Sequence, residues 1–223
     1  MVSADFYGVF EENLPFWGGL SEGDKQFIYD NSKHVVFPKG TNIHDGNECT
    51  GVILIRSGCL RLYMMSEEGK DISLYRLFAG DVCMLSASCA LQSITFEVLV
   101  DADEESDCVV IAGPAFAELS RRNTDVQVYA LETTAARFSE VMWVMQQILF
   151  MSFDRRLAIF LLDESAKNGS DLIKMTHEQI AKYMGSAREV VSRMLKYFSS
   201  EGLVEVSRGG IKLLDKKRLR ALT

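Results

Sequence analysis

The residues best suited to chemistry lie between Thr176 and Ser200, in the segment THEQIAKYMGSAREVVSRMLKYFSS. The pattern predicts two short helices, and the second carries outward-facing polar and basic groups of the kind that contact nucleic acids. Gly185 falls between the helices, where the chain must turn sharply and a Cβ would be costly. Ala181 is small enough for close helix approach, and Val191 can pack beneath the second helix. This spacing of alanine, glycine and valine is typical of a DNA-binding helix-turn-helix.

Two capping boxes predict where these helices begin. Thr176 with Gln179, and Ser186 with Glu189, have the spacing in which a hydroxyl and a longer polar side chain satisfy each other's backbone amides. Each helix therefore has its own start signal.

The cysteines allow a second kind of chemistry. They are five in number and form no CxxC pair, so neither a disulfide framework nor a zinc finger is expected. Cys83 and Cys89 have Ser86 and Ser88 between them, and this group could form a redox pair or line an apolar ligand pocket. The alternative is that both cysteines are small buried hydrophobic residues, the usual fate of a free cysteine. No acid pair, nucleophile constellation or metal cluster predicts an enzyme.

Composition and charge bound the class of protein. The 223 residues are 48% hydrophobic and 25% charged, which is typical of a globular protein with a real core. No apolar run approaches the roughly 18–20 residues of a membrane span, and no secretory signal is visible, so we expect a cytoplasmic protein without a membrane partner. The sequence from Ser170 onward contains 11 Lys and Arg residues and 6 Asp and Glu residues, a net charge of +5. The rest of the chain has a net charge of −12. An acidic body with a basic end indicates a nucleic-acid footprint confined to one domain.

The spacing of apolar residues before the helix-turn-helix indicates first a short helix and then a series of strands. Residues 21–32 predict a short helix capped by Ser21. From His34 to about Ala112, short β-rich runs alternate with glycine turns, which predicts an antiparallel barrel or sandwich that ends at Gly113 and Pro114. The predicted strands are HVVF, VILIRSG, LRLYMM, ISLYRLF, ITFEVLV and CVVIA.

From about Asn123 the period becomes helical. Leu131, Phe138 and Met145 recur every seven residues, and the positions three further on, Thr134, Val141 and Ile148, complete a coiled-coil-like stripe. A helix packed on its own domain is the alternative, but its place before a DNA-binding unit favours dimerisation.

A second helix, DRRLAIFLLDESAK, follows with Asp154 as its predicted cap. After the helix-turn-helix, two short strands flank Gly209 and Gly210, a hairpin turn signal that predicts a wing. The basic tail KKRLRAL predicts one last amphipathic turn.

Barrel, long helix and winged helix in this order resemble the Crp/Fnr family of bacterial transcription regulators. The resemblance covers nearly the whole chain: PKGT and HDGN are similar to the opening turns of the family's β-roll, RSGCLRLY and RLFAGD to its middle strands, and SAREVVSRMLKYFSSEGLV to its recognition helix. It implies an α+β fold with an N-terminal antiparallel, jelly-roll-like β-roll that senses an effector (1–122), a dimerisation helix (123–151) and a winged helix-turn-helix (152–223).

The resemblance also assigns roles on the recognition helix. Family members present a Glu, then a Ser or Gly, then an Arg to the major groove, and the matching residues are Glu189, Ser192 and Arg193. Arg193 can donate two hydrogen bonds to guanine, and Glu189 can accept one from cytosine, although Glu189 could instead only cap the helix. Arg188 is at a position that also reads bases in the cyclic-AMP branch. Thr176, His177, Lys182 and Lys196 are expected to meet phosphates or nothing.

The sensor departs from two branches of the family. The cyclic-nucleotide branch needs an arginine in its phosphate cassette, and this chain has none between Arg76 and Arg121. The segment from Cys83 to Cys89 stands in its place. The oxygen sensors ligate an iron–sulfur cluster with N-terminal cysteines, but the first cysteine here is Cys49. Haem on His34 or His44, as in haem-sensing relatives, is a further option, although surface or turn histidines are commoner.

We therefore expect a homodimeric transcription regulator that binds double-stranded DNA at an inverted repeat. An unidentified small molecule or redox signal in the β-roll would shift the dimer between two geometries, with a hinge near Phe153 and Asp154. RNA polymerase is a further partner that the resemblance implies. The alternative is a constitutive regulator whose β-roll is only structural.

Overall fold

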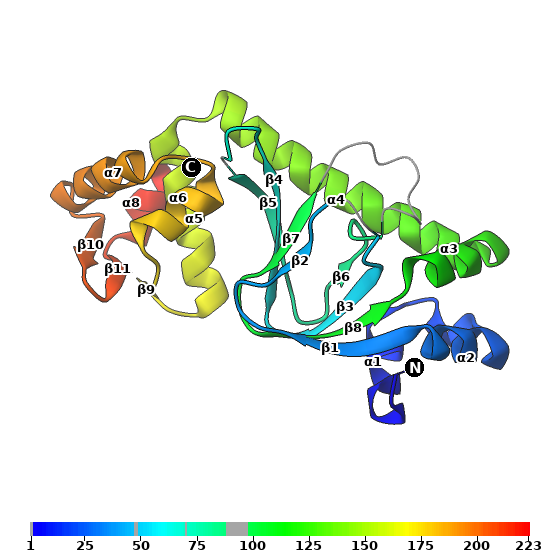
Figure 1. Cartoon of the computed structure of the whole chain (residues 1–223). Coiled ribbons are helices and arrows are strands. Elements are labelled where there is room, and N and C mark those ends of the chain that lie inside the picture. The colour runs from blue at the N-terminus through cyan, green and yellow to red at the C-terminus, as the bar shows by residue number, and fades with distance from the viewer. Residues whose placement is uncertain (1, 47–48, 70, 88–97) are drawn as a thin grey trace. The chain divides into compact units, whose positions relative to one another are not determined.

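The structure is a computed structural model that describes residues 2–46, 49–69, 71–87 and 98–223 (Figure 1). The chain divides into two compact units. The first consists of Met1–Met65 and Leu74–Val141, and the second of Ser66–Ser73 and Met142–Thr223. One long helix contributes residues to both.

The first unit is built on two antiparallel sheets of four strands. One sheet has the order β1-β8-β3-β6 and the other the order β2-β7-β4-β5. The α+β fold and the antiparallel β-roll are therefore confirmed. The strands are β1 (Ser32–Phe37), β2 (Asn42–His44), β3 (Val52–Ser57), β4 (Cys59–Met65), β5 (Asp71–Phe78), β6 (Val82–Cys83), β7 (Leu99–Ala102) and β8 (Ser106–Ile111).

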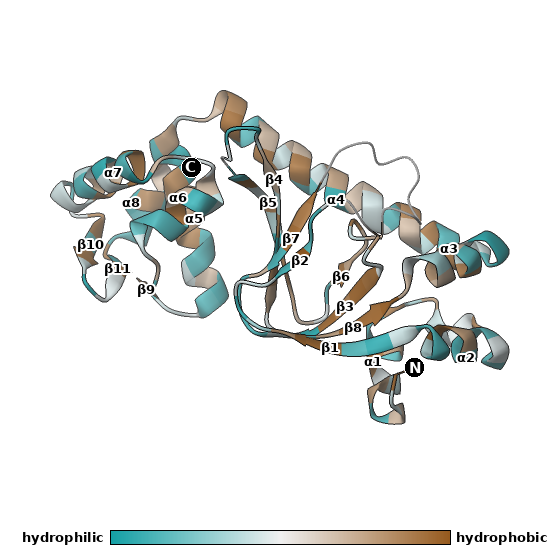
Figure 2. Ribbon diagram, viewed as in Figure 1, coloured by the Kyte–Doolittle hydropathy of each residue, from teal (hydrophilic) through white to brown (hydrophobic). Residues whose placement is uncertain are grey.

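Successive side chains of the central strands pack alternately into two hydrophobic cores. On β3, Ile53 and Ile55 join a cluster with residues of the other sheet, such as Leu62 and Val100. Val52 and Leu54 point the other way, into a cluster formed with the helices. Because both faces are covered, β3 and β8 read as continuous apolar runs, the brown strands of Figure 2.

Short helical segments surround this roll, and the sequence predicted one of them, which begins after Ser21. The predicted helix at Ser21 is confirmed, since the Ser21 hydroxyl accepts a hydrogen bond from the Asp24 amide. Gly113 and Pro114 end the β region as predicted, but they also begin a helix, because proline suits the first helical turn. The helical segments are η1 (Ala4–Phe6), α1 (Tyr7–Asn13), η2 (Trp17–Gly19), α2 (Glu22–Asp30) and α3 (Gly113–Arg122).

The long helix α4 (Thr124–Phe150) confirms the predicted helical segment and corrects its stripe. Leu131, Phe138 and Met145 are 60%, 64% and 47% exposed. Val141, three residues after Phe138, packs instead against the core of the roll. Of the predicted companions, Ile148 is 40% exposed, whereas Thr134 is half-buried. A second set, four residues further on, is exposed throughout, and it gives the outer stripe the alternating steps of three and four of a coiled coil. This second set consists of Val128, Ala135, Met142 and Leu149.

The second unit contains the predicted helix-turn-helix and wing. It has its own core, which includes Leu157, Ile180, Val191 and Phe198. Its elements are α5 (Phe153–Asn168), β9 (Leu172–Ile173), α6 (His177–Met184), α7 (Arg188–Ser200), β10 (Val204–Ser207), β11 (Gly210–Leu213) and α8 (Lys216–Ala221).

The start of α5 corrects one predicted cap. Ser152, not Asp154, is the N-cap residue, and Asp154 lies in the first helical turn. A hydrogen bond with the Ser152 side chain lowers the pKa of Asp154. No helix in the described part of the chain is long and apolar enough to cross a membrane.

Candidate nucleic-acid interface

The first helix of the motif begins and ends as its sequence predicts. The Thr176 hydroxyl accepts a hydrogen bond from the Gln179 amide at 3.1 Å, and the Gln179 side chain accepts one from the Thr176 amide at 2.8 Å. At its other end Gly185 takes a left-handed φ of +58°, a conformation that glycine adopts at no steric cost. Thr176 is exposed and His177 is half-buried.

The second capping box, from Ser186 to Glu189, is wrong. Helix α7 begins at Arg188 after Ala187, and no side chain caps it. The Ser186 amide donates to the Ala181 carbonyl at 2.9 Å, so Ser186 closes α6 instead of opening α7. Glu189 is left exposed in the first turn of α7, without the competing role of a cap.

Helix α7 has one buried face and one polar face. Val191, Leu195 and Phe198 are fully buried. The positions on the opposite side, one helical turn apart from each other, are all exposed. These are Glu189, Ser192, Arg193 and Lys196, with Arg188 exposed at the start of the helix.

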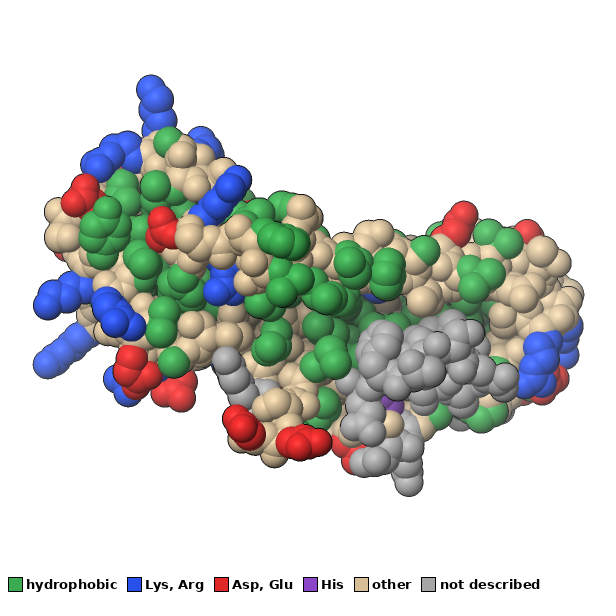
Figure 3. All heavy atoms as spheres, turned by 90° about the horizontal axis from the view of Figure 1, so that it is seen from above, with side chains coloured by type: hydrophobic (Ala, Val, Ile, Leu, Met, Phe, Trp, Pro, Cys, Tyr) green, Lys and Arg blue, Asp and Glu red, His purple; other side chains and the backbone are tan. Residues whose placement is uncertain are grey.

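The cations of this unit differ from those of the β-roll in having few carboxylate partners. In the first unit Arg56 pairs with Asp107 at 2.7 Å and Arg122 with Asp24 at 2.8 Å. Among the described residues, no carboxylate lies within salt-bridge distance of Arg188 or Arg193. The same is true of Lys174, Lys196, Arg208, Lys212, Lys217 and Arg220. Figure 3 shows Lys and Arg side chains projecting from this unit, with some Asp and Glu side chains among them.

The wing is a tight hairpin held against a third strand. Ser207 pairs with Gly210, so the turn residues are Arg208 and Gly209, one position earlier than predicted. The Ser207 hydroxyl accepts from the Gly209 amide at 3.2 Å. Gly210 has a φ of +131°, and a Cβ there would collide with the carbonyl of Ile173 on β9. Glycine is therefore required for β11 to approach β9.

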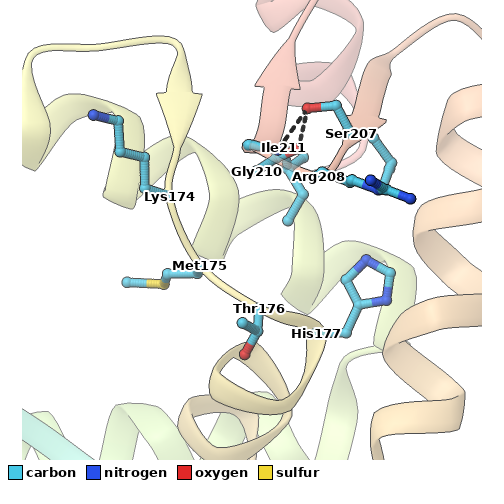
Figure 4. A pocket seen from close by; sticks show the side chains of 10 residues that line it. Lys174, Met175, Thr176, His177, Ser207, Arg208, Gly210 and Ile211 are labelled. Carbon is cyan, nitrogen blue, oxygen red and sulfur yellow. Dashed lines mark hydrogen bonds between the residues drawn. The ribbon is translucent and has the colours of Figure 1, made fainter.

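A hollow of about 310 Å³ separates the wing from the start of α6, and we call it the wing cleft (Figure 4). Thr176 and His177 lie on one wall and Arg208 comes from the other. Sequence reasoning missed Arg208, although a basic residue directly before the two glycines of the hairpin turn was a usable signal. The cleft is lined by Lys174, Met175, Thr176, His177, Val206, Ser207, Arg208, Gly209, Gly210 and Ile211.

The candidate sensor residues lie apart from this surface in the chain. Cys83 is a free thiol, and burial raises its pKa. The Ser86 hydroxyl donates to the Gly51 carbonyl at 2.7 Å. These contacts favour buried packing for Cys83 over a redox role. Ser88 and Cys89 lie outside the described residues, so their part in a redox pair stays a prediction.

Cys49 differs from the other cysteines that the structure describes. It is disulfide-bonded, although the sequence predicted no disulfide framework. Cys59, Cys83 and Cys108 are buried free thiols.

Both candidate haem histidines already have protein partners. The His34 ring lies 2.8 Å from the Asp107 carboxylate and stacks on Phe6. The Nδ1 atom of His44, which is 4% exposed, lies 3.0 Å from the Thr50 hydroxyl. No cluster of three or more potential metal ligands occurs within the described ranges.

A residue of α4 that sequence reasoning missed connects the helix to the β-roll. Arg137 donates to Asp81 at 3.2 Å and to Glu140 at 2.8 Å, and its guanidinium lies over the Tyr75 ring. Asp81 also accepts from the Phe78 amide at 2.8 Å. The turn after β5 and the middle of α4 are thereby joined within the first unit.

A winged helix-turn-helix with an exposed basic helix, carried by a chain with a β-roll, defines a DNA-binding regulator. The model of the Crp-like helix-turn-helix domain matches residues 155–222. A protein from Eubacterium rectale assigned as a transcriptional regulator of the Crp/Fnr family has a structure similar to this one. It is 46% identical, with a TM-score of 0.90, and the match covers 94% of this chain and 98% of that one.

Two more distant proteins are also similar to this chain. The cAMP-activated global transcriptional regulator Vfr of Pseudomonas aeruginosa is 25% identical over 75% of this chain and 82% of its own. FixK2 of Bradyrhizobium japonicum shares the fold, with a TM-score of 0.69, 20% identity, and coverage of 86% of this chain and 96% of that one. The chain belongs to the Crp/Fnr family of transcription regulators, and it is a DNA-binding regulator rather than an enzyme.

Proposed function

We propose that the protein acts as a homodimer and reads an inverted repeat by placing α7 of each protomer in the major groove of one half-site. The observation that carries this proposal is the polar face of α7. It is exposed, lies opposite Val191, Leu195 and Phe198, and carries two arginines without a carboxylate partner among the described residues. A helix of this kind fits the major groove.

The residue roles follow from the chemistry of that face. Arg193 donates two hydrogen bonds to guanine O6 and N7, and Glu189 accepts from cytosine N4. Glu189 adds selectivity because its charge repels phosphate wherever that base contact is missing. Arg188 and Ser192 lie at the edge of the same face. Thr176, His177 and Lys196 contact the backbone and set the position of α7.

Dimerisation is supported by the outer stripe of α4. Leu131, Phe138, Met142, Met145 and Leu149 are each at least 44% exposed, and hydrophobic side chains line α4 in Figure 3. An apolar stripe with steps of three and four is the pattern of a helix that pairs with a second copy of itself.

The β-roll is proposed to receive the signal. Vfr is described as cAMP-activated, but the absence of an arginine between Arg76 and Arg121 argues for a different effector here. The partners already held by His34 and His44 argue in the same way against haem. Binding of the effector would shift the population toward the dimer in which the two α7 helices are about one DNA turn apart, with Phe153 and Asp154 at the hinge. RNA polymerase is the proposed protein partner on the promoter.

A redox signal is the second candidate, and the disulfide at Cys49 favours it. Operator affinity should then differ between reduced and oxidised protein, and Cys49→Ser should abolish the difference. Cys83→Ser and Cys89→Ser test the pair that the sequence suggested. If no small molecule and no redox change alters operator affinity, the alternative of a constitutive regulator with a structural β-roll holds.

The experiment for the base-reading role begins with selection of an operator from a random DNA library. Arg193→Ala should weaken binding to that operator by roughly 1–3 kcal/mol at fixed salt and remove the preference for one guanine. Arg121→Ala, which changes an exposed arginine of α3, is the matched control and should leave binding unchanged. An Arg193→Ala protein with the full base preference would remove Arg193 from the reading face.

A further inference from the structure

The turn between β4 and β5 belongs to the same compact unit as the helix-turn-helix. Residues Ser66–Ser73 form one unit with Met142–Thr223, whereas Met65 and Leu74, on either side of that turn, belong to the β-roll unit. We name Ser66–Ser73 the hairpin tip. A movement of β4 or β5 therefore reaches the second unit through a short covalent connection.

Three contacts hold the hairpin tip on the helix-turn-helix. Ile72 packs on the turn between α6 and α7, since a Cβ added at Gly185 would lie 3.1 Å from the Cγ1 atom of Ile72. The hydroxyl of Ser73, which is 8% exposed, donates to the Lys182 carbonyl at 3.3 Å. The Asp71 carboxylate lies 3.9 Å from the Lys182 ammonium. The tip thereby contacts the last turn of α6 and the glycine that leads into α7.

The charge of the hairpin tip opposes DNA binding. Glu67 and Glu68 are exposed on it, and Asp71 forms an ion pair with a lysine of α6. Carboxylates carried by a DNA-binding unit repel the phosphates that its cations attract. The tip therefore adds negative charge to the one part of the chain that is otherwise basic.

The contact also restricts α7. This helix begins at Arg188, three residues after Gly185, so a side chain packed on the turn ties the start of α7 to β4 and β5 of its own protomer. Reading an inverted repeat requires the two α7 helices to lie about one DNA turn apart. A helix tied to its own β-roll resists a movement to that spacing.

The strands that end in the hairpin tip also form the interior of the roll. Leu62 of β4 and Leu74 of β5 pack in the core between the two sheets. Because the interior of a protein is closely packed, a change in that core moves these strands. A signal received in the roll has this route to the turn of the helix-turn-helix.

We propose that the hairpin tip is an autoinhibitory clamp. Docked on the turn between α6 and α7, it holds the regulator in a state of low DNA affinity, and the signal received by the β-roll releases it. This inference rests on the proposed function of α7. It gives the direction in which the contact acts, because loss of the contact increases DNA affinity.

An engineered disulfide tests that direction. A Cβ at Gly185 would lie 3.6 Å from the Cβ of Ile72, within the range of about 3.5–4.5 Å that a disulfide needs. The full-length Ile72→Cys, Gly185→Cys protein is oxidised with oxidised glutathione, and the cross-link is verified by peptide mass spectrometry. Operator affinity, measured by anisotropy, should be about fivefold or more lower than in the same protein after reduction.

The reduced form is the reference because Gly185 has a φ of +58°, at which any cysteine is strained. Ile72→Cys alone, Gly185→Cys alone and the wild type, taken through the same oxidation, are the controls for the native cysteines. Their affinities should change less than that of the double variant. Failure of the cross-link to form, or a cross-linked protein that binds DNA as tightly as its reduced form, would overturn the clamp.

Loss of the contact should have the opposite effect. Ile72→Ala leaves Gly185 unchanged and should tighten operator binding by about fivefold or more in the absence of any effector. Circular dichroism and thermal melting verify that the variant is folded. Weaker binding by the folded variant would show that the tip positions α7 for DNA, which contradicts autoinhibition.

The ion pair is tested with a control of equal charge. Asp71→Asn and Glu105→Gln each remove one carboxylate, and Glu105 is exposed on the turn between β7 and β8. Asp71→Asn should tighten binding more than Glu105→Gln does. Equal effects would mean that Asp71 acts only through net charge and would remove it from the clamp.

The proposed function has a separate outcome. If Arg193→Ala loses its guanine preference while the cross-link and Ile72→Ala leave affinity unchanged, the clamp is overturned and the function stands. If neither the wild type nor Ile72→Ala binds any selected duplex, the proposed function itself is refuted.

Discussion

Glu189 shows how one residue gains a role when the backbone around it is known. The sequence allows it to be either a cap for α7 or a base-reading group, because both need a carboxylate in the first turn. In the structure Ser186 closes α6 and Ala187 precedes α7. The carboxylate of Glu189 is therefore free of the capping bond, and its place in the first turn is also favoured by the helix dipole.

The buried thiols make stability depend on pH in a direction that can be worked out. Burial raises the pKa of Cys108 to about 12, against about 8.5 for a thiol in an unfolded chain. Between these values the unfolded chain loses the proton while the folded protein keeps it. The free energy of unfolding should therefore fall as the pH rises above about 8.5, by up to ~1.4 kcal/mol per pH unit for this group.

Urea unfolding at pH 8, 9 and 10 measures this slope. Cys108→Ala should lower stability at pH 8 but make the decline with pH shallower. Burial raises the pKa of Cys83 as well, so part of the decline should persist in the variant. Equal slopes for variant and wild type would show that Cys108 is not responsible.

The wing is the element most dependent on one backbone position. Gly210→Ala would place a Cβ against the Ile173 carbonyl at a φ of +131°, and we expect the free energy of unfolding to fall by on the order of 1–3 kcal/mol. Gly209→Ala is the matched control, because its Cβ would meet only the Ser207 hydroxyl at 3.7 Å. Chemical denaturation of both variants makes the comparison. Similar losses would mean that β9 and β11 can separate at little cost.

Elements with strong local signals could be predicted, and those that depend on distant partners could not. Helix α6 could be predicted from the sequence because Thr176, Gln179 and Gly185 fix both of its ends within ten residues. Strands β6 and β9 have two residues each and exist only through their pairing with β3 and β11. Helix α3 was hidden because Pro114 was interpreted as a stop, although proline also starts helices.

The candidate site could be predicted where it depends on a single helix, but not where it depends on segments that are distant in the sequence. The polar face of α7 follows from the helical period alone, since Val191, Leu195 and Phe198 mark the buried side. The wing cleft could not be predicted without the fold, because Arg208 and His177 are far apart in sequence and line the same hollow only when β11 pairs with β9.

At the scale of the whole molecule, charge divides between the two parts of the chain. The net charge of −7 conceals a basic C-terminal part and an acidic remainder. The acidic part would be repelled by the phosphate backbone, which favours approach to DNA through the second unit alone. The division agrees with the ion pairs, because the arginines paired with carboxylates are concentrated in the β-roll unit.

The register of α4 gives the sharpest test of the dimer. If the stripe steps by three and four, Met142, which is 44% exposed, lies at the interface, while Trp143, which is 48% exposed, lies beside it. Met142→Glu would place two carboxylates against each other across the twofold axis, and their desolvation should raise the dimer dissociation constant by about 100-fold or more. Trp143→Glu should leave the dimer intact, as measured for both variants by sedimentation velocity across a range of concentrations. Dissociation by Trp143→Glu and not by Met142→Glu would assign a different face of α4 to the interface.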